Sequence, residues 1–150
     1  MKRYTLTLFT LLVLTTISFG QLRFGAGISL LDFDALGVQG KVLLDLEEKT
    51  GQPIDGAGTF TYYFRDGFTQ WAIDLDAHYR LAVIADNIEL DPIAGIQFAR
   101  VGTDFGSNNE IGINLGANFT IPIESFIFYA QPKFTIGGFD ALTISAGILF

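Results

Sequence analysis

The sequence predicts an all-β fold, an eight-stranded antiparallel up-and-down transmembrane β-barrel, on three observations. Apolar and polar residues alternate with a period of two in segment after segment from Gln21 onward, as half-buried strands require. Hydrophobic residues reach 49% of the 150 residues and charged residues only 17%, against a usual quarter. The polar side of the alternating segments is small and mostly neutral, unlike a strand face that meets water. The length is that of one domain.

Residues 1–20 are expected to form a cleaved signal peptide. Lys2 and Arg3 precede an apolar run from Leu8 to Ile17, and small residues lie close to Gly20, in the order typical of secretory signals. The alternative is a membrane anchor, but the run is short for the roughly 20 residues that a spanning helix needs, and threonines interrupt it. The barrel domain is therefore expected at residues 21–150.

The first four strands are expected near residues 22–29, 38–46, 59–65 and 71–82. In the first three, the even-numbered residues are mainly apolar and the odd-numbered residues are mainly polar or small. In the fourth, the apolar residues are odd-numbered and begin with Trp71, while four ionisable residues share the even-numbered side. Each pattern places one side of the strand in an apolar environment and the other in a polar one.

The last four strands are expected near residues 90–100, 111–119, 126–136 and 142–150. The strand near 90–100 is the weakest, and Pro92 marks its beginning. The strand 111–119 alternates apolar residues with Gly and Asn, and the strand 126–136 alternates Phe, Ala and Ile with Gln131, Lys133 and Thr135. The final strand has apolar residues at its even-numbered positions and ends in Phe150. The longest connection is expected at 47–57.

The bulk of the apolar side decides which way the barrel faces. Its Phe, Leu and Ile side chains are too large in total to fill the interior of an eight-stranded barrel. With the apolar side against lipid and the small polar side in the interior, both sides are accommodated, and closure leaves no strand edge unpaired in hydrocarbon.

This orientation assigns two sets of side chains. The inward-pointing charged residues are interpreted as a network that plugs the lumen, because isolated buried charges are costly and paired ones are tolerated; they are Arg23, Lys41, Asp45, Arg65, Asp74, Asp76, His78, Arg80 and Lys133. Outward aromatics should gather in girdles near the two membrane interfaces. Phe24, Phe60, Tyr79, Phe119 and Phe126 are expected near one rim, and Phe64, Trp71, Phe98 and Phe134 near the other.

The alternating strands, the export signal and the final strand resemble small outer-membrane β-barrel proteins of the OmpX or OmpA-barrel kind. In that family, alternating apolar residues and a terminal aromatic on the last strand are read by the barrel-assembly machinery. The matching residues are Leu142, Ile144, Ala146, Ile148 and Phe150. The resemblance implies the bacterial outer membrane as location, with its lipid and that machinery as partners. Against the family pattern, the 47–57 connection falls on the periplasmic side, where turns are usually short.

The function expected from these observations is a structural or surface-interaction role without porin-type transport. The first alternative is a secreted or periplasmic soluble barrel that binds an apolar ligand, and the second is a lipid-modifying outer-membrane enzyme. An enzyme is not favoured, because His78 is the only His and a Ser-His-Asp triad would need Ser29, Ser107, Ser125 or Ser145 to approach it. Of these serines, Ser29 and Ser145 share its inward orientation. No cofactor or metal is expected. The surplus of acidic residues, with nine Lys and Arg in all, excludes a basic patch for nucleic acid.

Overall fold

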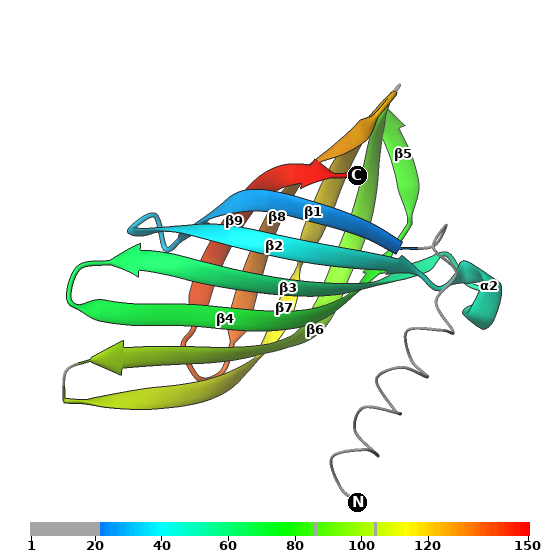
Figure 1. Cartoon of the computed structure of the whole chain (residues 1–150). Coiled ribbons are helices and arrows are strands. Elements are labelled where there is room, and N and C mark those ends of the chain that lie inside the picture. The colour runs from blue at the N-terminus through cyan, green and yellow to red at the C-terminus, as the bar shows by residue number, and fades with distance from the viewer. Residues whose placement is uncertain (1–21, 86, 104) are drawn as a thin grey trace, which may run out of the picture.

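The computed structural model describes residues 22–85, 87–103 and 105–150, so the predicted signal peptide lies outside the described residues. Eight strands close into an antiparallel barrel (Figure 1). They are β1 (Leu22–Leu31), β2 (Ala35–Asp45), β3 (Ile54–Arg65), β4 (Phe68–Tyr79), β6 (Ile88–Thr103), β7 (Gly106–Ile123), β8 (Phe126–Ile136) and β9 (Ala141–Leu149). A short ninth strand, β5 (Ala82–Ala85), pairs only with the start of β6, and β4 continues the wall by pairing with β6 directly. The predicted fold class is confirmed.

The two ends of the barrel differ in their connections. The turns after β1, β3, β6 and β8 lie at one end, called here the turn end. The opposite end, called the terminal end, holds the start of β1, Phe150, the four-residue helix α2 (Glu47–Thr50) and β5 (Figure 1). Gly51 closes α2 in the left-handed conformation, with φ of 67°, which glycine adopts without a steric penalty.

Several strand boundaries differ from the sequence prediction by a few residues, and the start of β3 is one of them. β3 begins at Ile54 rather than near Thr59, because the Asp-Gly-Ala-Gly segment 55–58 has little strand propensity of its own but pairs in register with β2. The longest connection therefore shrinks to residues 46–53. As a result Phe60, expected near a rim, lies in the middle of β3 and its ring centroid is 6.1 Å from that of Trp71.

The barrel is closed by the pairing of β1 with β9. Their register runs from Gly25 opposite Leu149 to Leu31 opposite Thr143. Beyond it, Phe24 and Phe150 exchange two backbone hydrogen bonds, of 3.0 and 2.8 Å. The terminal aromatic residue is thus part of the closing seam, and the wall has no unpaired edge strand among the described residues.

The wall has its apolar face outward and its polar face inward. Outward side chains such as Ile28 and Ile111 are 57% and 70% exposed, while inward Asn114 and His78 are 0% and 1% exposed. The inside-out assignment made from the alternation is therefore confirmed. Within the described ranges, no helix has the length and apolar composition needed to cross a membrane.

Two apolar clusters lie inside the barrel, one toward each end. At the turn end, Leu31, Ala35 and Tyr63 pack with three alanines and with the half-buried Phe139. At the terminal end, Leu43, Ala57, Tyr129 and Leu149 pack with Ile127. Most of the buried polar and charged side chains lie between these two clusters. The interior is thus layered, with polar groups in the middle.

Candidate functional site

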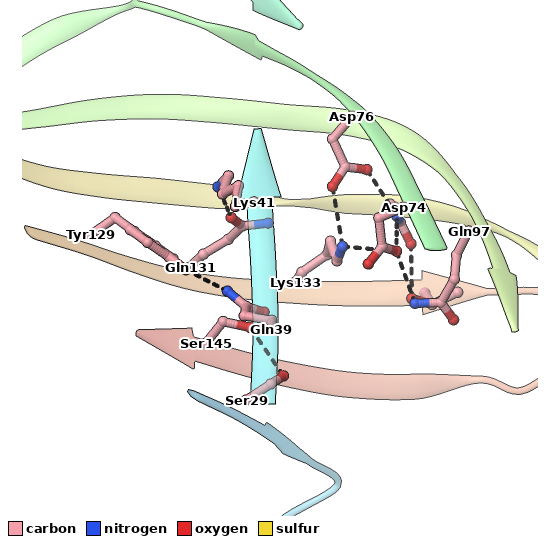
Figure 2. Close-up of polar contacts among 12 residues, drawn as sticks. Ser29, Gln39, Lys41, Asp74, Asp76, Gln97, Tyr129, Gln131, Lys133 and Ser145 are labelled. Carbon is pink, nitrogen blue, oxygen red and sulfur yellow. Dashed lines mark hydrogen bonds and ion pairs between the residues drawn. The ribbon is translucent and has the colours of Figure 1, made fainter. Parts of the chain in front are cut away.

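The centre of the lumen holds a group of buried side chains, called here the lumen cluster: Asp74, Asp76, Asn114 and Lys133. The Lys133 ammonium lies 2.9 Å from Asp74 Oδ1 and 3.1 Å from Asp76 Oδ2. The Asn114 amide donates to both carboxylates at 2.8 Å. Figure 2 shows Lys133 between Asp74 and Asp76. All four side chains point inward because they occupy the alternate positions of β4, β7 and β8 that face the lumen.

Further neutral side chains complete the hydrogen bonding of the lumen cluster. Gln97 on β6 donates to Asp74 Oδ1 at 2.9 Å, and the Thr135 hydroxyl donates to Asn114 Oδ1 at 2.9 Å. Every partner is buried. A buried ion pair is tolerated when its remaining lone pairs are satisfied in this way. The two carboxylates therefore share one cation and several neutral donors.

A second set of contacts crosses the lumen between β2 and β8. Lys41 donates to Gln131 Oε1 at 2.6 Å, and its ammonium lies 4.6 Å from the centroid of the Tyr129 ring. Gln39 donates to the Tyr129 hydroxyl at 2.6 Å (Figure 2). Strands β2 and β8 are not neighbours in the wall, because β1 and β9 lie between them. These side chains thus brace the barrel across its interior.

The remaining predicted lumen charges lie near the two mouths. At the terminal end, the half-buried Arg80 lies 3.2 Å from Asp45 and 2.8 Å from Glu47, and 3.7 Å from Asp55. At the turn end, Arg65 pairs with Asp34 in a setting open to solvent. Arg23 is exposed. The predicted single network therefore divides into a central buried cluster and peripheral pairs, because the strands carry these residues at different heights.

His78 is inward and buried, as the alternation predicted, but it has no catalytic neighbourhood. Ser29 and Ser145 lie in hydrogen-bond distance of each other, at 3.1 Å, near the turn end. The Ser29 hydroxyl also lies 3.4 Å from the Tyr63 hydroxyl, and His78 Nε2 has no hydrogen-bond partner among the described residues. The structure therefore brings neither serine to His78. Within the described residues, no three His, Cys, Asp or Glu side chains are placed to hold a metal ion.

Sequence reasoning missed the neutral members of the interior. Asn114, Gln97, Gln131 and Tyr129 make as many of the buried contacts as the charged residues do. The alternation of apolar and polar residues contains the signal for them, because each occupies an inward-facing position of its strand.

The lumen opens at the turn end into a vestibule of about 410 Å³. Its lining includes Tyr63, Ala72, Ala99 and Phe139, which belong to the apolar cluster at that end. The lining also includes Gln97, so the vestibule reaches a direct partner of the lumen cluster.

A closed barrel of eight antiparallel strands, apolar outside and polar inside, is the architecture of small transmembrane β-barrels. Comparison with solved structures finds this fold in proteins of bacterial outer membranes. The N-terminal β-barrel domain of Pseudomonas aeruginosa OprF matches with a TM-score of 0.65 at 16% identity, over 87% of this chain and 97% of that domain. A major outer membrane protein of Thermus thermophilus matches with a TM-score of 0.61 at 12% identity, over 87% and 99% of the two chains.

A third solved structure, neisserial surface protein A, matches with a TM-score of 0.56 at 12% identity, over 85% of this chain and 94% of that one. No family model matches the sequence, and no curated protein matches it. At these identities the similarity is one of fold. The chain therefore has the fold of an outer-membrane β-barrel, as its resemblance to the OmpX and OmpA-barrel kind implied.

Proposed function

We propose that this chain is a bacterial outer-membrane protein whose lumen is plugged, with a structural or surface-interaction role and no porin-type transport. The observation that carries the proposal is the lumen cluster, in which Lys133 joins two buried carboxylates across the centre of the barrel. Eight strands leave an interior only wide enough for side chains. Here that interior is filled by polar contacts between an apolar cluster at each end.

The outward face supports a membrane location. Leu75 and Ile113 are each 58% exposed, and Ile96 is 53% exposed, in the middle of three different strands. An exposed apolar surface that extends over several strands would promote aggregation in water, whereas the hydrocarbon of a membrane accommodates it. Delivery there would require the signal peptide predicted at 1–20 and recognition of the final strand by the barrel-assembly machinery. Of the side chains of that proposed signal, Leu142, Ile144, Ala146 and Ile148 share the outward face of β9, and Phe150 follows the strand and is exposed.

The location is tested by fractionating cells that express the full chain, with heat-modifiable gel mobility as the readout of folding. We expect the protein in the outer-membrane fraction, with a faster band in unheated samples because the closed barrel resists detergent. Recovery of a folded protein in the soluble periplasmic fraction would contradict the proposal. It would favour the soluble, ligand-binding barrel instead, although an interior of polar side chains does not suit an apolar ligand.

The plug is tested separately by conductance. Purified protein in planar lipid bilayers is expected to show no stable steps of porin size. The matched variant is Lys133→Ala, which removes the central cation and opens space beside Asp74 and Asp76. Large, reproducible steps in the unaltered protein would show that the packed lumen does not block ions.

A further inference from the structure

The outward face carries one charged residue whose position the plugged-barrel function leaves unexplained. Arg100 of β6 occupies an outward-facing position of its strand. All the remaining charged residues on the eight wall strands, within the part of the chain that the structure describes, occupy inward-facing positions. Arg100 follows Phe98 by two residues on the same face, which places it about 5 Å farther along the membrane normal toward the turn end. Arg100 therefore lies at the upper boundary of the apolar wall.

Aromatic side chains lie directly below this guanidinium. Trp71 is the cross-strand partner of Arg100, and its ring centroid lies 5.7 Å from that of Phe98 and 6.1 Å from that of Phe60. Trp is enriched where a membrane protein passes from hydrocarbon to headgroups. Trp71 and Phe98 thus mark an interface, and Arg100 is on its polar side.

Arg100 opens into a hollow of about 880 Å³ between the hairpins β3–β4 and β6–β7. Three hydroxyl groups, of Thr69, Thr103 and Ser107, line the hollow together with Arg65. Arg65 is engaged with Asp34, whereas Arg100 donates one hydrogen bond, of 3.0 Å, to the Ser107 hydroxyl and pairs with none of the described carboxylates. A guanidinium has five donors, so most of its capacity is free for an anion.

We propose that this hollow, resting on the outer-membrane location proposed above, binds the phosphoryl headgroup of a membrane lipid through Arg100. A guanidinium forms bidentate, charge-assisted hydrogen bonds with phosphate oxygens, and the hydroxyls of Thr69 and Ser107 supply further donors. The Trp71 and Phe98 rings and the apolar wall below them accept the acyl chains of the same molecule. Headgroup and chains thus meet two adjoining surfaces of matching chemistry.

The sequence contains a single Trp, Trp71, and it lines the proposed site, so its fluorescence reports binding directly. The full chain is folded in dodecyl maltoside micelles, which contain no phosphate, and titrated with dimyristoyl phosphatidic acid. We expect a saturable change in Trp71 emission and broadening of the lipid phosphorus resonance. Dimyristoylglycerol, which has the same chains without phosphate, and inorganic phosphate are each expected to bind at least tenfold more weakly.

Arg100→Gln is expected to weaken phosphatidic acid binding about tenfold, the factor that corresponds to one charge-assisted hydrogen bond. Arg100→Lys keeps the charge and should lose less. The matched control is Lys49→Gln, which removes one positive charge from the exposed helix α2 at the opposite end and should leave binding unchanged. The phosphorus resonance keeps the comparison valid if a substitution alters the emission of Trp71 itself.

Three results would overturn the inference: equal binding by wild type and Arg100→Gln, equal binding of dimyristoylglycerol, or equal binding of inorganic phosphate. Asp104, close in sequence and outside the described residues, provides one more test. If only the Asp104→Asn variant binds the lipid, that carboxylate holds the guanidinium and the proposed site is wrong for the native protein. Heat-modifiable mobility and vesicle insertion are measured on the same samples. A chain that inserts but does not bind lipid refutes this inference alone, and a chain that stays soluble refutes the membrane location.

Discussion

Replacing Lys133 with Met removes the cation that two buried carboxylates share. Its ammonium is within 3.1 Å of both Asp74 and Asp76, and the three side chains are between 1% and 5% exposed. Met has a similar length, so little volume is lost. Breaking a buried ion pair from one side costs about 3–5 kcal/mol, because the charge left behind has neither a partner nor water. We therefore expect Lys133→Met to lower the free energy of unfolding by that amount.

The assay is urea unfolding of the protein refolded in lipid vesicles, followed by Trp71 fluorescence. A triple variant, Lys133→Met with Asp74→Asn and Asp76→Asn, serves as the comparison. It leaves no unpaired charge in the cluster, and neutral amides still bond to Asn114, so it should recover at least half of the lost stability. Two results would refute the reasoning that these charges stabilise one another. One is a loss of unfolding free energy below about 1 kcal/mol in the single variant. The other is a triple variant that is as unstable as the single one.

Three further predictions use the same unfolding assay. Ala77→Arg puts a cation on the outward face in mid-strand and should lower the free energy of unfolding by about 2–4 kcal/mol. The adjacent inward Asp76→Asn should lower it less, since an amide still accepts and donates hydrogen bonds in a polar lumen. The reverse order would mean that the apolar face does not meet lipid. Gly95→Ala should destabilise by about 1–3 kcal/mol, because its Cβ would lie 2.3 Å from the carbonyl oxygen of Leu75, whereas the outward Gly40→Ala meets nothing within 4 Å and should be neutral. A tolerated Gly95→Ala would show that the lumen is less crowded than described. Tyr129→Phe removes the hydroxyl that accepts from Gln39 and should cost about 0.5–1.5 kcal/mol; an unchanged midpoint would show that this brace adds no stability.

The architecture was predictable from the sequence because alternation is a direct property of a strand. A single residue fixes the face of all its neighbours: once Trp71 is outward, Asp74 and Asp76 must be inward. The boundaries were less predictable where local propensity and pairing disagree. The segment Asp55 to Gly58 is a poor strand by composition, and only its register with β2 makes it part of β3.

The partners within the interior could not be derived from one strand at a time. Lys41 and Lys133 both have inward parity, yet Lys133 bonds to two carboxylates and Lys41 bonds to a glutamine and lies beside a tyrosine ring. Their difference depends on the relative heights of β2, β4 and β8 around the closed ring. Those heights follow from the stagger between strands, which alternation does not specify.

The contacts that cross the lumen also set the order in which this barrel can form. Asp76 and Lys133 are 57 residues apart in the chain, and the pairs Lys41 with Gln131 and Gln39 with Tyr129 are each 90 residues apart. Hairpins such as β3–β4 form from neighbouring residues, whereas these long-range contacts must wait for large loops to close, which is slow. Before β8 arrives, the carboxylates of β4 have no cation and cannot leave water. Insertion into the bilayer and closure of the ring are therefore expected to occur as one cooperative, late event.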